Sequence, residues 1–172
     1  MTINVYDWDD TLFFTKQTIV EAYVRAGAPR DEVLRNWGKP WYTWTFPYIT
    51  RKKSEIYKEL VRDPEWSPQP TPILEKLADE SRIYVITGAS ANAVHTLLDA
   101  KREQNKEDRY PINVLAASMT REGKIKTLRN FSYYMGTDVI YYDDDKETVR
   151  AVCLNGDLRG ITAVEVVNGT VS

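Results

Sequence analysis

The residues best suited to chemistry in this sequence are carboxylates that gather at two places. Asp7, Asp9 and Asp10 lie within the segment NVYDWDDTLF, just after the first apolar run, and residues 143–145 (DDD) follow a later run, VIYY. Like charges this close repel one another, and burying them is costly unless a cation or hydrogen-bond donors compensate. Mg²⁺ prefers hard oxygen ligands such as carboxylates, so the two groups predict a magnesium site if the fold brings them together.

Short apolar runs predict the strands that position these acids. We expect strands at residues 3–7, 83–87, 112–117, 139–142 and, as the last one, 161–167. Apolar residues at helical spacing predict helices at residues 16–26, around 33–37, from Ser54 to residue 61, from Pro72, from Ser90, at 124–135 and at 146–154. Strands that alternate with helices indicate a parallel sheet with helices on both faces. Residues 14–70 interrupt this alternation with helices alone, so we interpret them as a helical insert after the first strand.

The composition fits a folded protein of one domain, or a core with a small insert. The chain has 172 residues, 42% of them apolar, and a net charge of −2. These values argue against intrinsic disorder and against a strongly basic nucleic-acid binder. The single cysteine, Cys153, excludes an intrachain disulfide framework and fits a reducing compartment. No apolar stretch is long enough to span a membrane and no secretory signal is visible, so we expect a cytoplasmic protein. We also expect no obligate protein partner.

Chemically useful side chains follow the carboxyl ends of the predicted strands, where open α/β sheets bind their ligands. Thr87 and Gly88 end the second strand, and a hydroxyl with the free amides of the following helix suits phosphate oxygens. Lys124 and Lys126 open a later helix and offer positive charge to a phosphoryl group. Together with the acids, these residues predict a site for phosphate and Mg²⁺.

Three segments resemble the motifs of the haloacid dehalogenase-like (HAD) phosphohydrolases. DWDDTL resembles the first motif, D-x-D-x-T-L; IYVITG, residues 83–88, resembles the second; and VIYYDD, residues 139–144, is similar to the fourth. Their order and spacing match over nearly the whole chain. The resemblance implies an α/β fold with a three-layer α/β/α Rossmann-like core and a mostly parallel sheet. The core would comprise residues 1–13 and 71–172, with residues 14–70 forming a small helical cap.

The resemblance also implies a role for each matching residue. Asp7 is the expected nucleophile, which forms an aspartyl-phosphate, and Asp9 is the expected general acid and base. Thr87, followed by Gly88, is expected to bind the phosphoryl group.

The metal ligands and the third motif follow from the same resemblance. The third motif is one lysine, and the residues around Lys124 fit the family's pattern better than those around Lys126. The implied Mg²⁺ ligands are Asp7, Asp9 through its backbone carbonyl, Asp143 and Asp144. Two positions depart from the pattern: the family most often has Gly where this chain has Asp10, and many members that act on polynucleotide ends have Arg where it has Asp145.

The insert combines aromatic and basic residues. Residues 16–70 carry ten Lys or Arg, seven Asp or Glu and four of the five tryptophans. Aromatic rings among basic residues stack on bases and hold phosphates, whereas a small cap also needs large side chains for its own core. Both interpretations stay open for Trp41 and Trp44, which lie in a segment flanked by Pro and Gly. His95, the single histidine, is interpreted as a surface or packing residue.

These features predict a Mg²⁺-dependent phosphatase that hydrolyses a phosphomonoester. The aromatic, basic insert favours a nucleotide or a nucleic-acid end as substrate, and a phosphorylated small molecule such as a sugar phosphate is the alternative. A HAD-like binding module without turnover is the alternative from another functional class, which the full set of chemically required residue types argues against. A dehalogenase is disfavoured, because Asp9 and the acidic fourth motif suit phosphoryl chemistry and metal binding.

Overall fold

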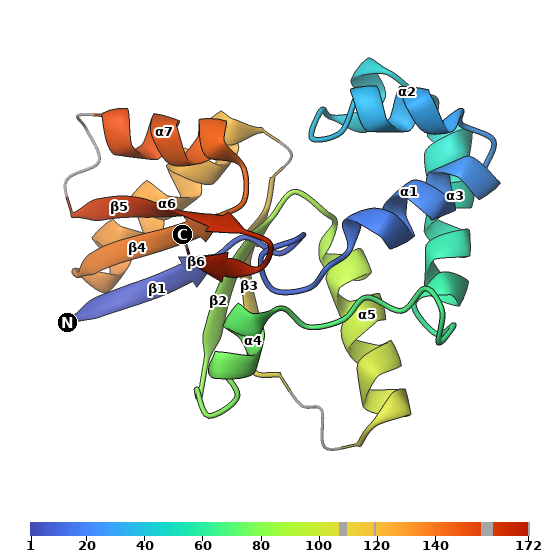
Figure 1. Cartoon of the computed structure of the whole chain (residues 1–172). Helices are drawn as coiled ribbons and strands as arrows, with labels where there is room; N and C mark the ends of the chain where they lie inside the picture. Colours follow the sequence, from blue (N-terminus) through green and yellow to red (C-terminus); the bar gives the residue numbers. More distant parts are fainter. Residues whose placement is uncertain (107–109, 119, 156–159, 172) are drawn as a thin grey trace. The chain divides into compact units, whose positions relative to one another are not determined.

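The computed structural model describes residues 1–106, 110–118, 120–155 and 160–171. The chain groups into two compact units. The first joins Met1–Phe14, Pro70–Ala91 and the chain from Tyr110 on, and the second joins Thr15–Gln69 with the chain from Asn92. The first unit contains the sheet, whereas the described residues of the second form helices and their connections (Figure 1).

In the described part of the first unit, six strands form one sheet in the order β3-β2-β1-β4-β5-β6. In this order, the first five described strands, from β3 through β2, β1 and β4 to β5, are parallel to their neighbours, and β6 is antiparallel to β5. This arrangement confirms the predicted α/β class with a mostly parallel sheet. The strands are β1 (Thr2–Tyr6), β2 (Ile83–Thr87), β3 (Ile112–Ala117), β4 (Asp138–Asp143), β5 (Ile161–Val167) and β6 (Thr170–Val171).

Strand β6 follows the strand expected to be the last, so that expectation is wrong. A two-residue turn, Asn168-Gly169, reverses the chain and pairs Val167 with Thr170. Both turn residues have positive φ, 50° at Asn168 and 73° at Gly169. Such turns match the twist of antiparallel strands, and Asn-Gly is the residue pair that adopts them most readily.

Among its described residues, the first unit has three helices beside the sheet: α4 (Pro72–Lys76), α6 (Arg121–Met135) and α7 (Lys146–Leu154). Helix α4 begins as predicted, because the hydroxyl of Thr71 accepts a hydrogen bond from the amide of Leu74 at 3.4 Å. Helix α6 begins three residues earlier than predicted, because Thr120 caps it in the same way. It ends as predicted before Gly136, whose φ of 61° closes the last turn.

The second unit contains α1 (Lys16–Arg25), α2 (Arg30–Arg35), the short 3₁₀ helix η1 (Trp41–Thr43), α3 (Pro47–Leu60) and α5 (Ala91–Gln104). The predicted start of a helix at Ser54 is wrong. Helix α3 begins seven residues earlier, with Pro47 in its first turn, where a missing amide proton costs nothing. Ser54 lies inside the helix, and its hydroxyl donates to the carbonyl of Thr50 at 3.0 Å.

Helix α5 belongs by its contacts to the second unit. Arg62 near the end of α3 makes a two-pronged ion pair with Glu103 of α5, with N–O distances of 2.9 and 3.1 Å. The buried ammonium of Lys101 donates to the hydroxyl of Ser67 at 3.0 Å. Sequence alone placed α5 with the sheet, and the division at residues 14 and 70 stays a prediction.

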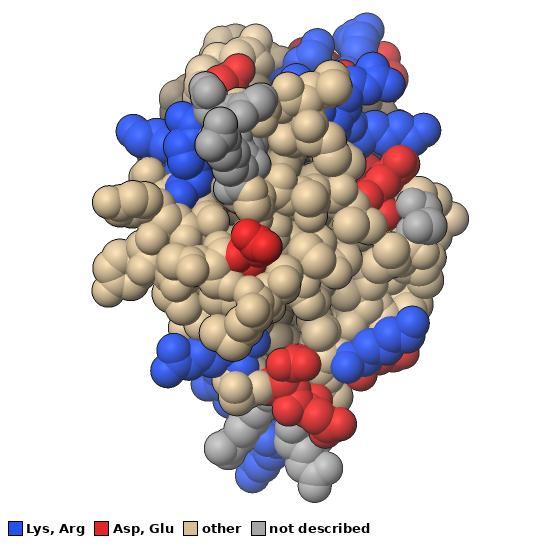
Figure 2. All heavy atoms as spheres, turned by 90° about the vertical axis from the view of Figure 1, so that its left-hand side faces the viewer, with Lys and Arg blue, Asp and Glu red and all other residues tan. Residues whose placement is uncertain are grey.

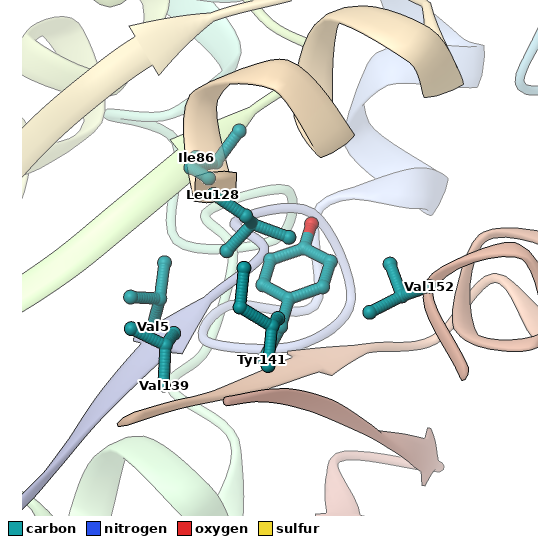
Figure 3. Packing of buried hydrophobic residues seen from close by; sticks show 7 residues of the cluster. Val5, Ile86, Leu128, Val139, Tyr141 and Val152 are labelled. Atoms are coloured by element: carbon teal, nitrogen blue, oxygen red, sulfur yellow. The ribbon is translucent and has the colours of Figure 1, made fainter. Parts of the chain in front are cut away.

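The core of the first unit lies between the sheet and helices α6 and α7. Figure 3 shows the ring of Tyr141 on β4 beside Leu128 of α6, with Val152 of α7 on its other side. Val5 and Val139 pack in the same cluster. Burying these side chains anchors both helices on the sheet, which fixes where their first residues lie.

Charged groups of both signs are spread over the face of the molecule seen in Figure 2, with uncharged residues between them. Neither sign dominates this face, which agrees with the net charge of −2. Within the described parts of the chain, no helix is both long and apolar enough to cross a membrane.

Candidate active site

Two neighbouring parallel strands end in buried carboxylates. Asp7 follows β1 and Asp143 ends β4, and their exposed fractions are 5% and 0%. The strands are in register up to Tyr6 and Tyr142, and the amide of Asp7 donates to the carbonyl of Tyr142 at 2.8 Å. Because the register is fixed by the ladder, the two acids must lie side by side at the carboxyl edge of the sheet.

One lysine joins these two acids. The ammonium of Lys124, in the first turn of α6, lies 3.1 Å from Oδ1 of Asp7 and 3.2 Å from Oδ2 of Asp143. Burial alone lowers the pKa of this lysine, but the two carboxylates outweigh that effect and raise it overall. Lys124 is therefore charged at neutral pH. Lys126, the alternative at the sequence level, is exposed.

A third carboxylate completes a candidate metal site. Among the described residues, Asp7, Asp143 and Asp144 each offer one oxygen within 4.8 Å of the others. Three hard oxygen donors and one lysine leave an excess of negative charge, and a divalent cation such as Mg²⁺ fits such a donor set. The side chain of Asp144 is the most open of the three.

The excess of negative charge contributes to raised pKa values of two of the carboxyl groups. Burial, and then the charge of Asp143, raise the pKa of Asp7 well above its usual range, although Lys124 opposes the shift. Burial and Asp143 likewise raise the pKa of Asp144 to about 7. Lysine and carboxyl pKa values rise together because one ammonium cannot compensate three acids. Without a metal ion, the site keeps protons that ordinary carboxyl groups lose.

The raised carboxyl pKa values predict how the metal-free protein responds to pH. Between the ordinary pKa of 3.8 and about 7, folded Asp144 holds a proton that the unfolded chain has lost, so stability falls as pH rises through this interval. After a discount for solvent screening, Asp144 should lower the free energy of unfolding by ~1.5 kcal/mol over this interval. Between pH 4.5 and pH 8, the melting temperature of the wild type should therefore fall by roughly 3–6 °C more than that of Asp144→Asn.

The measurement is the melting temperature in EDTA at both pH values, repeated with Mg²⁺. Mg²⁺ favours the ionised acids, so it should raise the wild-type melting temperature more at pH 8 than at pH 4.5. Equal pH profiles for the wild type and Asp144→Asn would contradict the prediction.

Tyr141 is a site residue that the sequence reading missed. Its buried hydroxyl donates to Oδ2 of Asp143 at 2.7 Å. Burial, followed by the charge of Asp143, raises the pKa of this hydroxyl well above 10, so it stays a donor. Tyr141 and Asp143 are two residues apart on β4. Because side chains alternate between the two faces of a strand, this spacing places both on one side, and it could have indicated Tyr141 from the sequence.

Asp145 has a structural role. Its carboxylate accepts hydrogen bonds from the amide of Glu147 at 3.1 Å and from the hydroxyl of Thr148 at 2.7 Å, so it caps α7. The amide of Asp145 in turn donates to Oδ1 of Asp143 at 2.9 Å. Asp143 is thus held by a tyrosine, a lysine and a backbone amide, which fixes its orientation.

Thr87 and Gly88 lie at the end of β2. The buried hydroxyl of Thr87 accepts a hydrogen bond from the amide of Ala89 at 2.9 Å, and its carbonyl accepts one from the amide of Ser118 at 2.8 Å. A Cβ atom on Gly88 would meet nothing nearer than the carbonyl of Ser118 at 3.7 Å. Their predicted phosphate-binding role stays a prediction.

Gly123 is a second residue that the sequence reading missed. It precedes Lys124, and a Cβ atom there would lie 1.9 Å from Oγ of Ser118 and 2.9 Å from Oγ1 of Thr120. Ser118 and Thr120, which lie between β3 and α6, therefore pack directly on this glycine. Close approach, rather than backbone conformation, requires glycine here.

We expect Gly123→Ala to lower the melting temperature by roughly 2–6 °C. Relief of the clash must displace Ser118, a cost of ~1–3 kcal/mol that outweighs the helix propensity of Ala. Differential scanning calorimetry measures the effect, with Gly88→Ala as the matched control that meets no close atom. Adding Ser118→Gly should restore part of the loss, and an unchanged melting temperature for Gly123→Ala would contradict the packing argument.

Asp9 and Asp10 follow Asp7 in the loop after β1. Asp9 is near enough for its charge to raise the pKa of Asp7, though less than the other acids do. Its roles as general acid and as carbonyl ligand stay predictions. Asp10 has a φ of 59°, and its amide donates to the carbonyl of Phe13 at 2.7 Å. Gly and Asp both tolerate this left-handed conformation, which accounts for Asp10 where the family most often has Gly.

Trp41 and Trp44 belong to the second unit. The ring of Trp44 lies 5.1 Å from that of Tyr23 and packs against the buried cluster of this unit. Its indole nitrogen is buried and has no hydrogen-bond partner among the described residues. These contacts give Trp44 a packing role, while substrate binding by Trp41 and Trp44 stays a prediction.

No protein-family model matches the sequence, and no curated protein matches it either. Solved structures do resemble it. CbbY from Rhodobacter sphaeroides in complex with phosphate superposes with a TM-score of 0.66 at 18% identity, over 96% of this chain and 87% of that one. A variant of CbbY in complex with xylulose-1,5-bisphosphate gives the same TM-score at 19% identity, with the same coverage.

A HAD hydrolase of family IA, variant 3, from Entamoeba histolytica is similar with a TM-score of 0.68 at 11% identity, over 98% of this chain and 85% of that one. Identities this low establish the fold alone. The chain therefore has the fold of the HAD-like hydrolases, and the α/β core expected from the three motifs is confirmed, whereas the helical cap stays a prediction.

Proposed function

We propose that this protein is a phosphatase that hydrolyses a phosphomonoester through an aspartyl-phosphate on Asp7. One observation carries the proposal: Lys124 bridges Asp7 and Asp143 in a buried site that Asp144 completes with a third carboxylate. A carboxylate, a cation and a metal-binding set at the carboxyl edge of a parallel sheet are what phosphoryl transfer requires. The HAD-like fold supports the same reaction class.

The proposed reaction has two displacements. An oxygen of Asp7 attacks phosphorus and forms an acyl phosphate, while the bond from phosphorus to the ester oxygen breaks. The leaving alkoxide takes a proton from the carboxyl group of Asp9. Water then attacks the same phosphorus, gives its proton to Asp9, and the bond from phosphorus to Asp7 breaks to release phosphate.

The remaining residues hold charge in place for these steps. Lys124 orients the carboxylate of Asp7 and offers positive charge next to the phosphoryl group. Asp7, Asp143 and Asp144 would hold Mg²⁺, with the backbone carbonyl of Asp9 as a further ligand. Bound Mg²⁺ supplies positive charge that neutralises phosphoryl oxygens and the acids themselves.

Two substrate classes remain candidates, each supported by one observation. The aromatic and basic residues of the insert, residues 16–70, support a nucleotide or a nucleic-acid end. Structural likeness to CbbY, which has been solved with xylulose-1,5-bisphosphate, supports a sugar phosphate. Of the two, the sugar phosphate has the more direct support, because it comes from a bound ligand on the same fold.

The test is phosphate release from a panel of substrates with Mg²⁺ and with EDTA. The panel comprises an aryl phosphate, mononucleotides, oligonucleotides phosphorylated at the 3′ or 5′ end, and sugar phosphates, at matched concentration. Metal-dependent release from any of them supports the reaction class, and the ranking decides between the substrate classes. Binding of phosphate and Mg²⁺ without release by a folded protein would instead favour the non-catalytic module.

A further inference from the structure

One stretch of the second unit lacks acidic residues entirely. Residues 33–54 read VLRNWGKPWYTWTFPYITRKKS, with five Lys or Arg, six Trp, Tyr or Phe, and no Asp or Glu. Charged residues make up 28% of the chain and are nearly balanced in sign, so a one-sided stretch of this length stands apart from the rest. It covers the end of α2, helix η1 and the first half of α3.

Some of these aromatic residues pack within the unit. Trp44 lies against Tyr23, and Trp37 packs on the same buried cluster with the ammonium of Lys16 above its ring at 5.3 Å. Lys53 is likewise engaged, 5.0 Å from the ring centre of Tyr23. These side chains explain part of the aromatic content as core packing.

Other residues of the stretch have no such role. Phe46 and Tyr48 are 62% and 64% exposed, and their rings stack on each other with centres 5.7 Å apart and planes 13° apart. Arg51 and Lys52 follow Tyr48 by three and four residues on α3, so the three side chains share one side of the helix. We call Phe46, Tyr48, Arg51 and Lys52 the aromatic-basic surface.

The cations of this surface form no ion pairs with described acidic side chains. In the described part of the chain, no ion pair involves Arg51 or Lys52, and both are exposed. Glu55, the first acid after the stretch, follows Arg51 by four residues on α3 but forms no ion pair with Arg51 or Lys52 among the described residues. Flat aromatic faces in water beside free cations are complementary to a flexible polyanion that carries flat apolar groups.

We propose that the aromatic-basic surface binds single-stranded nucleic acid. Bases stack on Phe46 and Tyr48, while the backbone phosphates lie against Arg51 and Lys52. A duplex has its base faces already stacked and offers the surface its phosphates alone. The inference concerns a binding surface of the second unit and holds whether or not the strand is also a substrate of the acidic site.

The test is fluorescence anisotropy with the full chain in EDTA. The probes are an end-labelled single-stranded oligonucleotide of mixed sequence with hydroxyl ends, the same sequence as a duplex, and unlabelled heparin as competitor. Unphosphorylated ends and the absence of metal separate this binding from the proposed hydrolysis. We expect the single strand to bind at least ten-fold more tightly than the duplex.

Two pairs of substitutions distinguish stacking from charge. Phe46→Ala with Tyr48→Ala should weaken single-strand binding at least ten-fold, with little effect on its salt dependence. Arg51→Gln with Lys52→Gln should weaken it and reduce the slope of log K against log salt by about 1.4.

Matched control pairs come from exposed residues of the first unit. Tyr133→Ala with Tyr134→Ala removes two aromatic rings that are 90% and 86% exposed, and Arg82→Gln with Arg129→Gln removes two exposed cations. Neither pair should change single-strand affinity more than two-fold.

Several results would overturn the proposal. The first is that the single strand does not bind at low salt. The second is that the single strand, the duplex and heparin bind with equal affinity and that Phe46→Ala with Tyr48→Ala leaves these affinities unchanged. The third is that the control pairs weaken single-strand binding as much as the substitutions in the surface do. Self-association that is lost with Phe46→Ala and Tyr48→Ala, without nucleic-acid binding, would assign the surface to an interface between protein copies.

Discussion

Replacing Asp7 with Asn is expected to abolish phosphatase turnover and to stabilise the metal-free protein. An amide cannot form the acyl phosphate, so we expect turnover to fall at least ~10⁴-fold, as for loss of other nucleophiles. The fold should survive, because Asn keeps an oxygen that can accept the hydrogen bond from Lys124. Turnover of the best substrate from the panel measures the first effect.

The gain in stability follows from the raised pKa of Asp7. A buried carboxyl group whose folded pKa lies above its unfolded value destabilises the fold at pH values above the unfolded value. Asn removes this charge, so the free energy of unfolding in EDTA at pH 8 should rise by a discounted ~1–2 kcal/mol. The melting temperature should then rise by roughly 2–6 °C. With saturating Mg²⁺ the advantage should vanish, since the wild type then gains a cation that the variant binds less well.

Asp138→Asn is the matched control, because Asp138 is an exposed acid at the opposite end of β4. It should leave turnover unchanged and the stability within ~0.5 kcal/mol. Acid-quenched enzyme should carry phosphate covalently in the wild type and in Asp138→Asn, but not in Asp7→Asn. Turnover of Asp7→Asn at the wild-type rate would remove Asp7 from the role of nucleophile.

The sequence predicts the sheet and the position of its acids well, and the reason is physical. Buried parallel strands need near-continuous apolar runs, so β1, β2 and β4 stand out, and residues that follow such runs must meet at one edge. Asp7 and Asp143 could therefore be paired without coordinates. Lys124 could be preferred over Lys126 only through the family resemblance, since both lie at the start of the same helix.

What escaped prediction depends on contacts that composition does not encode. Tyr141 donates a hydrogen bond to Asp143, but in the sequence it looks like one more apolar residue of the run VIYY. Gly123 reads as a weak helix residue until Ser118 is seen against it. Helix α5 carries no signal for the unit it packs on, because an amphipathic face fits any apolar neighbour.

Two of the differences, the start of α3 and strand β6, do have local signals in the sequence. Pro47 suits the first turn of α3, yet Ser54 is a residue type typical of helix caps and favours a later start. Asn168-Gly169 is a strong hairpin signal, yet the two residues after it make a strand too short to show alternation. Local signals are insufficient at both places, because packing against the neighbouring element decides where the helix begins and whether the short strand pairs.

The largest stability effect is expected from Lys124→Met. This substitution keeps an unbranched side chain that is one heavy atom shorter and removes the cation that faces two buried carboxylates. Breaking a buried ion pair on one side leaves uncompensated charge, which costs roughly 3 kcal/mol or more and lowers the melting temperature of the metal-free protein by about 6–12 °C. Turnover should also fall at least ~10²-fold, because Lys124 orients Asp7 and faces the phosphoryl group.

Lys126→Met is the matched control, since Lys126 is exposed and lies two residues further along the same helix. It should change stability by less than ~0.5 kcal/mol and leave turnover within two-fold. Equal effects of the two substitutions would contradict the assignment of Lys124. The charge argument also requires coupling: in the Asp7→Asn background one of the two carboxylates is gone, so Lys124→Met should cost the metal-free protein distinctly less. An undiminished cost there would mean that Lys124 stabilises the fold through packing of its stem rather than through the acids it joins.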